Sequence, residues 1–577
     1  MLSRVLKLGH LNILLHSSRY LSSCLPKMQK AYLRQCPDGE HFDFTFNLQN
    51  EQVKRQFNFT RKLAENVDVF LTRVQANLDK AISKKKKKKT EVNQTIEPVS
   101  VSLFINEKEV SREDICEQVF KTEGSIQLKI NGTVLNVIVN APWVVNLSLP
   151  ASILSDFPTY PSKFESIHTD LSLSEFLWSK SKDKREWTDV GTTYIHVPKN
   201  SDVNYYLKFS CIPKNDFSIG PKFEAISSCK VEAGPGECPF EERHAFTKEK
   251  LSGNQFRVVS YNILADLYCD SDHTREVLFP YCPPYALSID YRKQLILKEI
   301  IGYNADLLCL QEVDRKIYKY DLQPTLSRLG YESTYYNKGT DVAEGLAFFY
   351  NSSRFVLLDS EKLIFAQEVN KNPLFKDIWE KIQENEKLVS RVLARSTTLQ
   401  LNVIGSLENN EVLIVANTHL YFHPDADHIR LLHGCFAIRY LENVASEIEK
   451  RYEGKRVSLI FCGDFNSVPS CGIYQLYTTG SLPGNFQDYS SNKDEAIVNI
   501  DIKQPFHLGS ACGTPSYTNF TVGFADCLDY IFYDKSKLTV SQVVPFPSEE
   551  QLKQHSAIPS IVSPSDHIAL ISDLKWL

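Results

Sequence analysis

Several patterns that mark common kinds of protein are missing from this chain of 577 residues. None of its 14 cysteines forms a Cys-x-x-Cys pair, which argues against a zinc knuckle and against thioredoxin-like chemistry. The scattered cysteines suit reduced thiols inside a cell better than a disulfide framework. There is no run of about 18 apolar residues, so we expect no membrane-spanning segment and no membrane partner. The formal net charge is −5, so a nucleic-acid partner would need a local basic patch.

Acidic side chains are absent from the first 37 residues, because the first acid of the chain is Asp38. This stretch carries lysines, arginines and serines, and His10, Asn12 and His16 interrupt the apolar core that a secretory signal would need. A basic, serine-containing, acid-free N-terminus is typical of a mitochondrial transit peptide. We therefore predict that residues 1–37 direct the chain to the mitochondrial matrix. The alternative is an N-terminal tail without that role.

The stretches that follow are expected to form an accessory region. Residues 38–97 are mixed in composition and include Lys84–Lys89, which we interpret as a solvated loop, with an RNA-steering segment as the alternative. Residues 98–240 contain short apolar runs, and the two runs that flank the Asn-Gly pair at 131–132 predict a hairpin. The regular spacing predicts a β-rich, sandwich-like domain with an immunoglobulin-like arrangement. Residues 241–254 are polar and are expected to be a linker.

The largest domain is predicted to occupy residues 255–577. Short apolar runs alternate there with helical patterns, of which Ile289–Tyr303 and His428–Tyr452 are the clearest because their apolar residues recur every three to four positions. The alternation of strands and helices predicts an α/β domain.

One strand of this domain ends in a pair of polar residues. The apolar run Leu459–Cys462 is followed by Gly463, Asp464 and, two positions later, Asn466. Alternate residues of a strand share a face, so Asp464 and Asn466 can point into one site. An Asx-turn is the alternative interpretation, since Gly-Asp and Asn-Ser are ordinary turn sequences.

More polar side chains lie at or just beyond the ends of apolar runs in the same domain. They are Asn262, Glu312, His419, Asp529, Asp566 and His567. A single His or Asp is usually a satisfied polar residue, but so many groups at strand ends point to one catalytic site. Carboxylate and amide oxygens without a cysteine ligand favour Mg²⁺ or Mn²⁺ over Zn²⁺. The remaining histidines of this part, His423, His428 and His433, are interpreted as surface or helix residues.

The polar groups belong to an ordered set of short motifs. In chain order these are Tyr-Asn-Ile-Leu-Ala-Asp, Leu-Gln-Glu-Val, Asn-Thr-His-Leu, Gly-Asp-Phe-Asn-Ser, Leu-Asp-Tyr-Ile and Ser-Asp-His. As an ordered set, they resemble the exonuclease–endonuclease–phosphatase superfamily over roughly residues 255–577. The segment 285–292, Tyr-Ala-Leu-Ser-Ile-Asp-Tyr-Arg, is similar to the deadenylase branch of that superfamily. The resemblance implies a two-sheet β-sandwich flanked by helices.

The resemblance also implies how a metal ion would be held. Glu312 is implied as the primary metal ligand, and Asp566 as a second acid close to the metal. Asp464 is our candidate for the general base, oriented by Asn466. In a two-metal mechanism, Asp464 and Asn466 would instead become ligands.

Four further groups are implied to act on the phosphate. His567 would contact a non-bridging oxygen, and Asp529 would hold the other ring nitrogen and favour the charged imidazole. His419 would be a second phosphate contact, and Asn262 would order the metal or the phosphate.

The resemblance further implies that Phe524 and Pro424 clasp an adenine base, with a plain core role as the alternative for Phe524. We therefore expect a Mg²⁺-dependent 3′-to-5′ exoribonuclease that releases AMP from 2′,5′-linked oligoadenylate and from the 3′,5′-linked poly(A) tails of mitochondrial RNA. The alternatives are an inositol-phosphate phosphatase, an abasic-site endonuclease and a non-catalytic RNA-binding module. We make no prediction of a protein partner from the sequence.

Overall fold

The computed structural model describes residues 29–36, 38–49, 53–87, 98–498 and 500–577. By packing, the chain divides into two compact units. The first unit comprises Met1–Val145, Glu165–Glu175 and Cys211–Phe223, and the second comprises Asn146–Phe164, Phe176–Ser210 and Glu224–Leu577. Within the described residues, no helix is both long and apolar enough to span a membrane.

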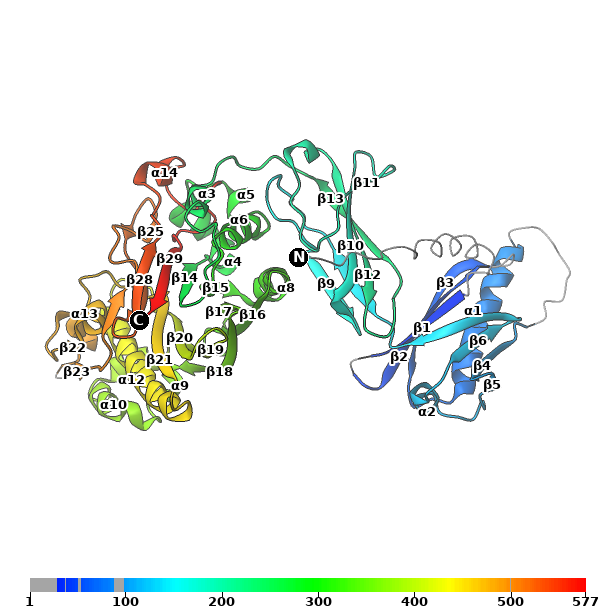
Figure 1. Ribbon diagram of the computed structural model, residues 1–577, viewed down its shortest axis with the longest axis horizontal. Helices are drawn as coiled ribbons and strands as arrows, with labels where there is room; N and C mark the ends of the chain where they lie inside the picture. The colour runs from blue at the N-terminus through cyan, green and yellow to red at the C-terminus, as the bar shows by residue number, and fades with distance from the viewer. Residues whose placement is uncertain (1–28, 37, 50–52, 88–97, 499) are drawn as a thin grey trace, which may run out of the picture. The chain divides into compact units, whose positions relative to one another are not determined.

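A seven-stranded sheet forms the centre of the first unit (Figure 1). Its order is β3-β2-β1-β7-β6-β4-β5, and its strands are β1 (Gln29–Gln35), β2 (His41–Gln49), β3 (Lys54–Lys62), β4 (Val101–Ile105), β5 (Lys108–Glu109), β6 (Ile126–Ile130) and β7 (Thr133–Val139). Helices α1 (Val67–Lys87) and α2 (Cys116–Lys121) contribute Phe70, Leu78 and Phe120 to the same hydrophobic core. The hairpin predicted around the Asn-Gly pair is confirmed as β6 and β7, which pair antiparallel.

This sheet corrects the predicted domain boundaries. Strand β1 pairs in parallel with β7, with Gln29 opposite Leu135, so residues on both sides of the predicted division at 97–98 share one sheet. Strand β1 also lies within the range assigned to a transit peptide, whereas residues 1–28 of that range lie outside the described residues. The first four lysines of the Lys84–Lys89 run are in helix α1 instead of a loop. Lysine favours helix and its charge suits a helix C-terminus.

The remaining β-rich residues form smaller sheets. A four-stranded sheet has the order β11-β10-β12-β13, and a two-stranded sheet pairs β8 with β9. The strands are β8 (Trp143–Ser148), β9 (Lys163–Ile167), β10 (Asp170–Ser181), β11 (Thr188–Gly191), β12 (Tyr206–Lys214) and β13 (Phe223–Lys230). The stretch 98–240 is therefore β-rich as predicted, but it is not one immunoglobulin-like sandwich because β4 to β7 belong to the seven-stranded sheet.

The predicted linker 241–254 is partly a packed helix. Helix α3 (Pro239–His244) carries Arg243, which is buried and donates hydrogen bonds to the carbonyl oxygens of Pro545 and Ala569 at 3.0 and 2.7 Å. A buried guanidinium must find acceptors, and these backbone oxygens fix the segment within the second unit.

Two six-stranded sheets form the core of the second unit. One has the order β16-β17-β15-β14-β29-β28, with β14 (Gln255–Asn262), β15 (Leu307–Asp314), β16 (Tyr331–Asn337), β17 (Glu344–Asn351), β28 (Leu538–Val543) and β29 (Leu570–Trp576). The other has the order β18-β19-β20-β21-β27-β24, with β18 (Phe355–Ile364), β19 (Thr398–Ser406), β20 (Glu411–His419), β21 (Arg456–Asp464), β24 (Leu508–Ser510) and β27 (Asp529–Asp534). Each sheet has a parallel pair at its centre, β14 with β15 and β20 with β21.

Side-chain alternation explains why the two sheets stack. Leu413 and Val415 of β20 join Val258 of β14 in a core between the sheets. Their neighbours Ile414 and Ala416 point the other way, into a core shared with helix α12. The predicted β-sandwich flanked by helices is therefore confirmed.

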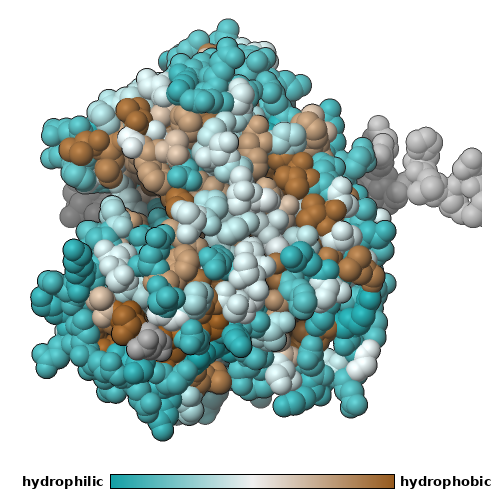
Figure 2. Space-filling model, turned by 90° about the vertical axis from the view of Figure 1, so that its left-hand side faces the viewer, coloured by the Kyte–Doolittle hydropathy of each residue, from teal (hydrophilic) through white to brown (hydrophobic). Residues whose placement is uncertain are grey.

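Several helices cover the second unit, and the two clearest predicted helices are among them. They are α6 (Ile289–Gly302) and α12 (Asp427–Arg451), together with the shorter α5 (Pro284–Leu287), α9 (Phe365–Glu368), α10 (Lys376–Ile382), α11 (Glu386–Leu393) and α13 (Gly472–Thr479). His428 and His433 are buried in α12, while His423 lies on an exposed loop. On the face drawn in Figure 2, hydrophobic residues gather in several separate patches among hydrophilic ones.

Candidate active site

Strand register brings the predicted polar groups together at one edge of the sandwich. His419 is paired with Asp464 across the parallel strands β20 and β21, and Asp464 is paired with Asp529 across β21 and β27. In the facing sheet, Asn262 is the last residue of β14, beside Gln311 of β15. Because neighbouring strands are about 4.8 Å apart, these pairings place the side chains within reach of one another.

A β-bulge turns Glu312 toward this edge. The pairing of β15 with β17 shifts between Leu310 and Val313, and Glu312 has a φ of 55° in the left-handed region. Its two carboxylate oxygens accept hydrogen bonds from Asn262 Nδ2 at 3.0 Å and from the Ala265 backbone N–H at 2.9 Å. A glutamate held in a costly backbone conformation is typical of a functional position.

Asp464 lies opposite Glu312 and shares a donor with it. Its Oδ2 accepts from Asn262 Nδ2 at 3.1 Å, and its Oδ1 accepts from the Asn466 backbone N–H at 2.9 Å. The second contact is an Asx-turn, with Asn466 at a φ of 48°. The stretch is therefore both an Asx-turn and part of the predicted site, because the turn orients the Asp464 carboxylate. The amide of Asn466 donates to the Leu420 carbonyl oxygen at 3.0 Å.

Burial and neighbouring acids make these carboxylates weak acids. Burial, followed by the charges of Asp566 and Glu344, raises the pKa of Glu312 to about 7. Burial, followed by the charge of Asp529, raises the pKa of Asp464 to about 6. Two buried acids that share one donor are costly without a compensating positive charge. A cation between them would remove that cost.

His567 and Asp529 form a hydrogen-bonded pair next to Asp464. His567 Nδ1 lies 2.8 Å from Asp529 Oδ2, which also accepts from Thr518 Oγ1 at 2.6 Å. His567 Nε2 lies 3.5 Å from Asp464 Oδ2. Burial lowers the pKa of His567, but the carboxylates of Asp529, Asp464 and Asp566 together raise it well above its ordinary value. The imidazole is therefore charged and presents an N–H toward the site.

The imidazole of His419 is neutral, unlike that of His567. Its Nε2 lies 3.7 Å from Asp464 Oδ2 and 3.9 Å from Glu312 Oε1. Burial, followed by the charges of Lys338 and His567, lowers the pKa of His419 well below its ordinary value. Lys338 Nζ is 3.3 Å from His419 Nδ1, and an ammonium can only donate. The proton of the neutral ring is therefore on Nε2, which faces the site.

Sequence patterns missed two charged residues of this site. Lys338 follows strand β16, and Glu344 begins β17. The two form an ion pair at 3.1 Å, and the Glu344 side chain is fully buried. Neither residue follows an apolar run of the kind that marked the other groups, so local pattern held no signal for them.

Asp566 and Phe524 lie on segments that meet beside His567. Asp566 Oδ2 accepts from Asn519 Nδ2 at 3.2 Å. Asn519 begins a hairpin of β25 (Asn519–Phe520) and β26 (Ala525–Asp526), and Phe524 is in its turn, 46% exposed. This exposure excludes the core role for Phe524. Pro424 is also exposed, in the loop after β20. Base binding by Phe524 and Pro424 stays a prediction.

A buried polar network joins the two sheets behind the acids. Gln311 Nε2 donates to Asn417 Oδ1 at 2.8 Å, and Asn417 Nδ2 donates to Gln400 Oε1 at 3.1 Å. Gln311 and Asn417 belong to the motifs that contain Glu312 and His419. Paired buried amides fix the sheets relative to each other and so hold the opposing acids in place.

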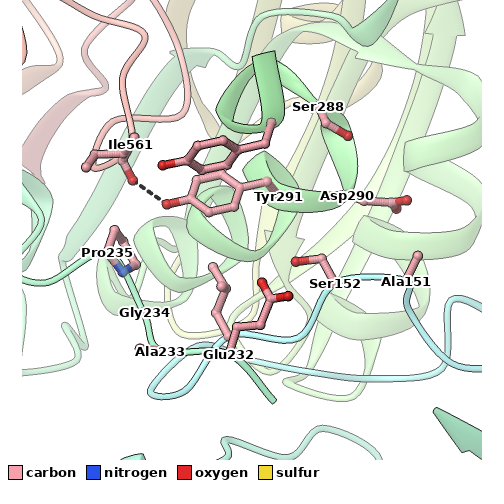
Figure 3. A pocket seen from close by; sticks show the side chains of 12 residues that line it. Ala151, Ser152, Glu232, Ala233, Gly234, Pro235, Ser288, Asp290, Tyr291 and Ile561 are labelled. Carbon is pink, nitrogen blue, oxygen red and sulfur yellow. Dashed lines mark hydrogen bonds between the residues drawn. The ribbon is translucent and has the colours of Figure 1, made fainter. Parts of the chain in front are cut away.

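The 285–292 segment supports the site from behind. The fully buried Arg292 donates from Nη1 to the carbonyl oxygens of Leu264 and Pro564 at 2.8 and 3.2 Å, so it ties the turn after Asn262 to the turn before His567. Figure 3 shows the neighbouring Tyr291, whose hydroxyl donates to the Ile561 carbonyl oxygen at 2.7 Å, on the wall of a cavity of about 580 Å³. The acids and histidines described above do not line this cavity.

The assembled side chains fit a divalent cation. Asp464, Asp529 and His567 offer ligand atoms within 4.8 Å of one another. His567 is charged, so neither of its ring nitrogens has a lone pair for an ion, and oxygen donors remain: Glu312 and Asp464, with amide oxygens nearby. Oxygen-rich sites of this kind suit hard divalent cations.

Comparisons with known proteins agree with this chemistry. The model of the Endonuclease/Exonuclease/phosphatase family matches residues 259–567. 2′,5′-Phosphodiesterase 12 of Rattus norvegicus is 38% identical over 589 residues, covering 95% of this chain and 94% of the relative, and the Homo sapiens protein gives the same values. The CCR4-Not complex 3′-5′-exoribonuclease subunit Ccr4 of Schizosaccharomyces pombe is 29% identical over 349 residues, covering 56% of this chain and 49% of the relative. The chain belongs to the endonuclease/exonuclease/phosphatase family and is a metal-dependent hydrolase.

Proposed function

We propose that this protein is a Mg²⁺-dependent 3′-to-5′ exoribonuclease that releases AMP from oligoadenylates. Its substrates would be 2′,5′-linked oligoadenylate and the 3′,5′-linked poly(A) tails of mitochondrial RNA. The names of the relatives support both linkages, since one is a 2′,5′-phosphodiesterase and another is an exoribonuclease, whose RNA substrate is 3′,5′-linked. The observation that carries the proposal is the buried pair Glu312 and Asp464, held by the same amide of Asn262.

Each side chain has a task in hydrolysis of a phosphodiester. Glu312 would hold Mg²⁺, with Mn²⁺ as an alternative, and Asp566 is a further candidate ligand. In a two-metal mechanism, Asp464 and Asn466 would become ligands in place of the base role described below. The bound ion would neutralise charge that develops on the phosphoryl oxygens.

The protein's own groups would perform the proton transfer and orient the phosphate. Asp464 accepts the proton of the attacking water, because its pKa of about 6 leaves it mostly ionised at neutral pH. Asn262 and the Asn466 N–H hold that carboxylate in place. Charged His567 donates a hydrogen bond to a non-bridging oxygen, and neutral His419 donates a second from Nε2.

Adenine preference would come from Phe524 and Pro424. Both are exposed on loops that adjoin catalytic groups, and stacking of a base on an aromatic ring contributes about 1–3 kcal/mol. Stacking depends on the base and not on whether the 2′ or the 3′ hydroxyl carries the phosphate. Both linkages could therefore share this contact.

One experiment tests the activity and separates it from the alternatives. The purified chain is incubated with 2′,5′- and 3′,5′-linked oligoadenylate, oligouridylate, inositol phosphates and abasic DNA, with Mg²⁺ or with EDTA. We expect Mg²⁺-dependent AMP from both oligoadenylates, identified by mass. Release of inorganic phosphate, an incision at abasic sites, or RNA binding without turnover would each replace the proposal by another function of the site.

We also propose delivery to the mitochondrial matrix by the residues that precede strand β1. The support is their basic, serine-containing, acid-free composition. Cleavage must fall before Gln29, since β1 is part of the seven-stranded sheet. Residues 1–28 fused to a fluorescent reporter should give a mitochondrial signal and a shortened N-terminus by mass. A diffuse signal from an uncut fusion would refute the proposal.

A further inference from the structure

A second surface feature lies beside the active site. A groove of about 720 Å³ runs between α11 and the loop that follows β20, and we call it the loop groove. Its lining residues are Glu386, Lys387, Ser390, Arg391, Ala394, Arg395, Tyr421, His423, Asp425 and Glu495. The groove is shallow and open to solvent, which suits an extended strand better than an enclosed small ligand.

The groove begins one residue away from the catalytic strands. The Leu420 N–H donates to the Asp464 carbonyl oxygen at 2.9 Å, and the Leu420 carbonyl oxygen accepts from Asn466 Nδ2 at 3.0 Å. Tyr421 follows directly and forms part of the groove wall. A chain that leaves the catalytic site on this side therefore enters the loop groove.

Aromatic rings in this loop offer flat surfaces for stacking. The rings of Tyr421 and His423 are stacked, with centroids 6.0 Å apart and planes at 20°. Phe422 does not line the groove itself, but its ring contacts both of these lining residues, with centroids 5.6 Å from Tyr421 and 6.5 Å from His423, and it is 69% exposed. An exposed aromatic side chain next to the site has a free face on which a base can stack.

The charges of the groove leave one cation for a phosphate. Arg391 is paired with Asp425 and Glu495, and Lys387 is paired with Asp494, so these carboxylates offset both charges. Arg395 has its guanidinium 4.4 Å from the Tyr421 ring centre, and no carboxylate pairs with it among the described residues. Such a stacked guanidinium retains donors for a phosphate oxygen.

We propose that the loop groove binds the part of the RNA on the 5′ side of the scissile phosphate. A base of that part stacks on Phe422, and a phosphate contacts Arg395. This inference rests on the proposed exoribonuclease function and adds a subsite for the leaving strand.

A pair of substrates isolates this subsite. The p-nitrophenyl ester of adenosine 5′-phosphate carries the terminal adenylate, but a nitrophenol replaces the leaving strand. Hexa-adenylate carries both parts. We compare kcat/KM of the full-length enzyme on the two substrates for Phe422→Ala, Phe422→Trp and Arg395→Gln. Matched controls outside the groove are Phe217→Ala, at a side chain 94% exposed, and Arg185→Gln, at another exposed arginine.

Phe422→Ala should lower kcat/KM on hexa-adenylate by about tenfold and change the ester by less than about twofold, and Phe422→Trp should restore most of the loss. Arg395→Gln should also reduce the salt slope on hexa-adenylate by about 0.7, as expected for one lost phosphate contact with a single strand. The two controls should match the unaltered enzyme.

Three results would decide against the subsite. Equal losses on both substrates would mean that the loop only positions the catalytic groups. Unchanged hexa-adenylate kinetics would mean that the leaving strand takes another path, leaving the groove for a different partner. Unaltered enzyme that releases neither nitrophenol nor AMP with Mg²⁺ would instead overturn the proposed function itself.

Discussion

The sheets of the two units are buried in different ways. Exposed residues recur along β3 at the edge of the seven-stranded sheet, while every residue of β15 and β20 is buried. A strand covered on both faces reaches solvent only at its ends, so polar side chains placed there converge on one small edge. Among the described residues, the acid–histidine group that could hold a metal lies in the second unit. The side chains of the candidate active site therefore lie at the ends of fully buried strands.

The first test of this difference between the two units is to remove the acid on the bulge of β15, where the largest loss of activity is expected. Glu312→Ala should lower kcat by at least about a thousandfold at saturating Mg²⁺, because several kcal/mol of transition-state stabilisation depend on the ion it would hold. Steady-state kinetics and a thermal melt check this, with Glu117→Ala on helix α2 as the control. Turnover that survives in a folded variant would remove Glu312 from the metal site.

The next largest effect is expected at the end of β21. Asp464→Asn should reduce kcat by about 10²–10⁴-fold, the usual cost of losing a general base, while the Kd for oligoadenylate stays close to that of the unaltered enzyme. Single-turnover kinetics and fluorescence anisotropy measure the two quantities separately. If binding is lost and chemistry is not, Asp464 has a structural role.

A smaller effect is expected on the exposed hairpin beside His567. Phe524→Ala should lower kcat/KM for oligoadenylate by roughly tenfold to a hundredfold, since it removes about 1–3 kcal/mol of stacking. Oligouridylate should lose less, so the adenine-to-uracil ratio should fall for both linkages. Phe217→Ala is the exposed control. A constant ratio in a well-folded variant contradicts the stacking role.

The smallest effect on activity is expected in the first unit. Leu78→Ala empties a fully buried position in the core beneath helix α1 and should destabilise that unit by about 2–5 kcal/mol. Turnover of the p-nitrophenyl ester at low temperature should change by less than about twofold. Calorimetry should show a lower first transition. A large loss of ester turnover would show that the first unit is also needed for catalysis, against the difference between the units described above.

Sequence predicted the strand-end residues because their signal is local. An apolar run followed by Asn262, His419 or Asp464 predicts both the strand and the place where it opens to solvent, and the order of the motifs supplied the family. Lys338 and Glu344 carry no such signal. They reach the site because β17 pairs with β15, with Glu344 opposite Asp314, and that contact is set by the tertiary fold.

The accessory region was harder to predict for the same reason. The parallel pairing of β1 with β7 joins residues about a hundred positions apart, so composition alone placed the domain boundary wrongly. The hairpin of β6 and β7 was predicted correctly because two adjacent strands and their Asn-Gly turn form a single local pattern.

The left-handed backbone at Glu312 recurs at Leu264 and Asn466, which follow the candidate site residues Asn262 and Asp464 by two positions. Side chains other than glycine pay about 1–3 kcal/mol in such a conformation. The free energy of unfolding of the second unit is therefore lower than its packing alone would give. The strain that lowers it is concentrated at the candidate active site. Replacing Glu312 by glycine would relieve both backbone strain and a buried acid. If Glu312 holds the metal as proposed, selection for heat resistance alone would favour an inactive protein, and a demand for turnover would keep this residue in place.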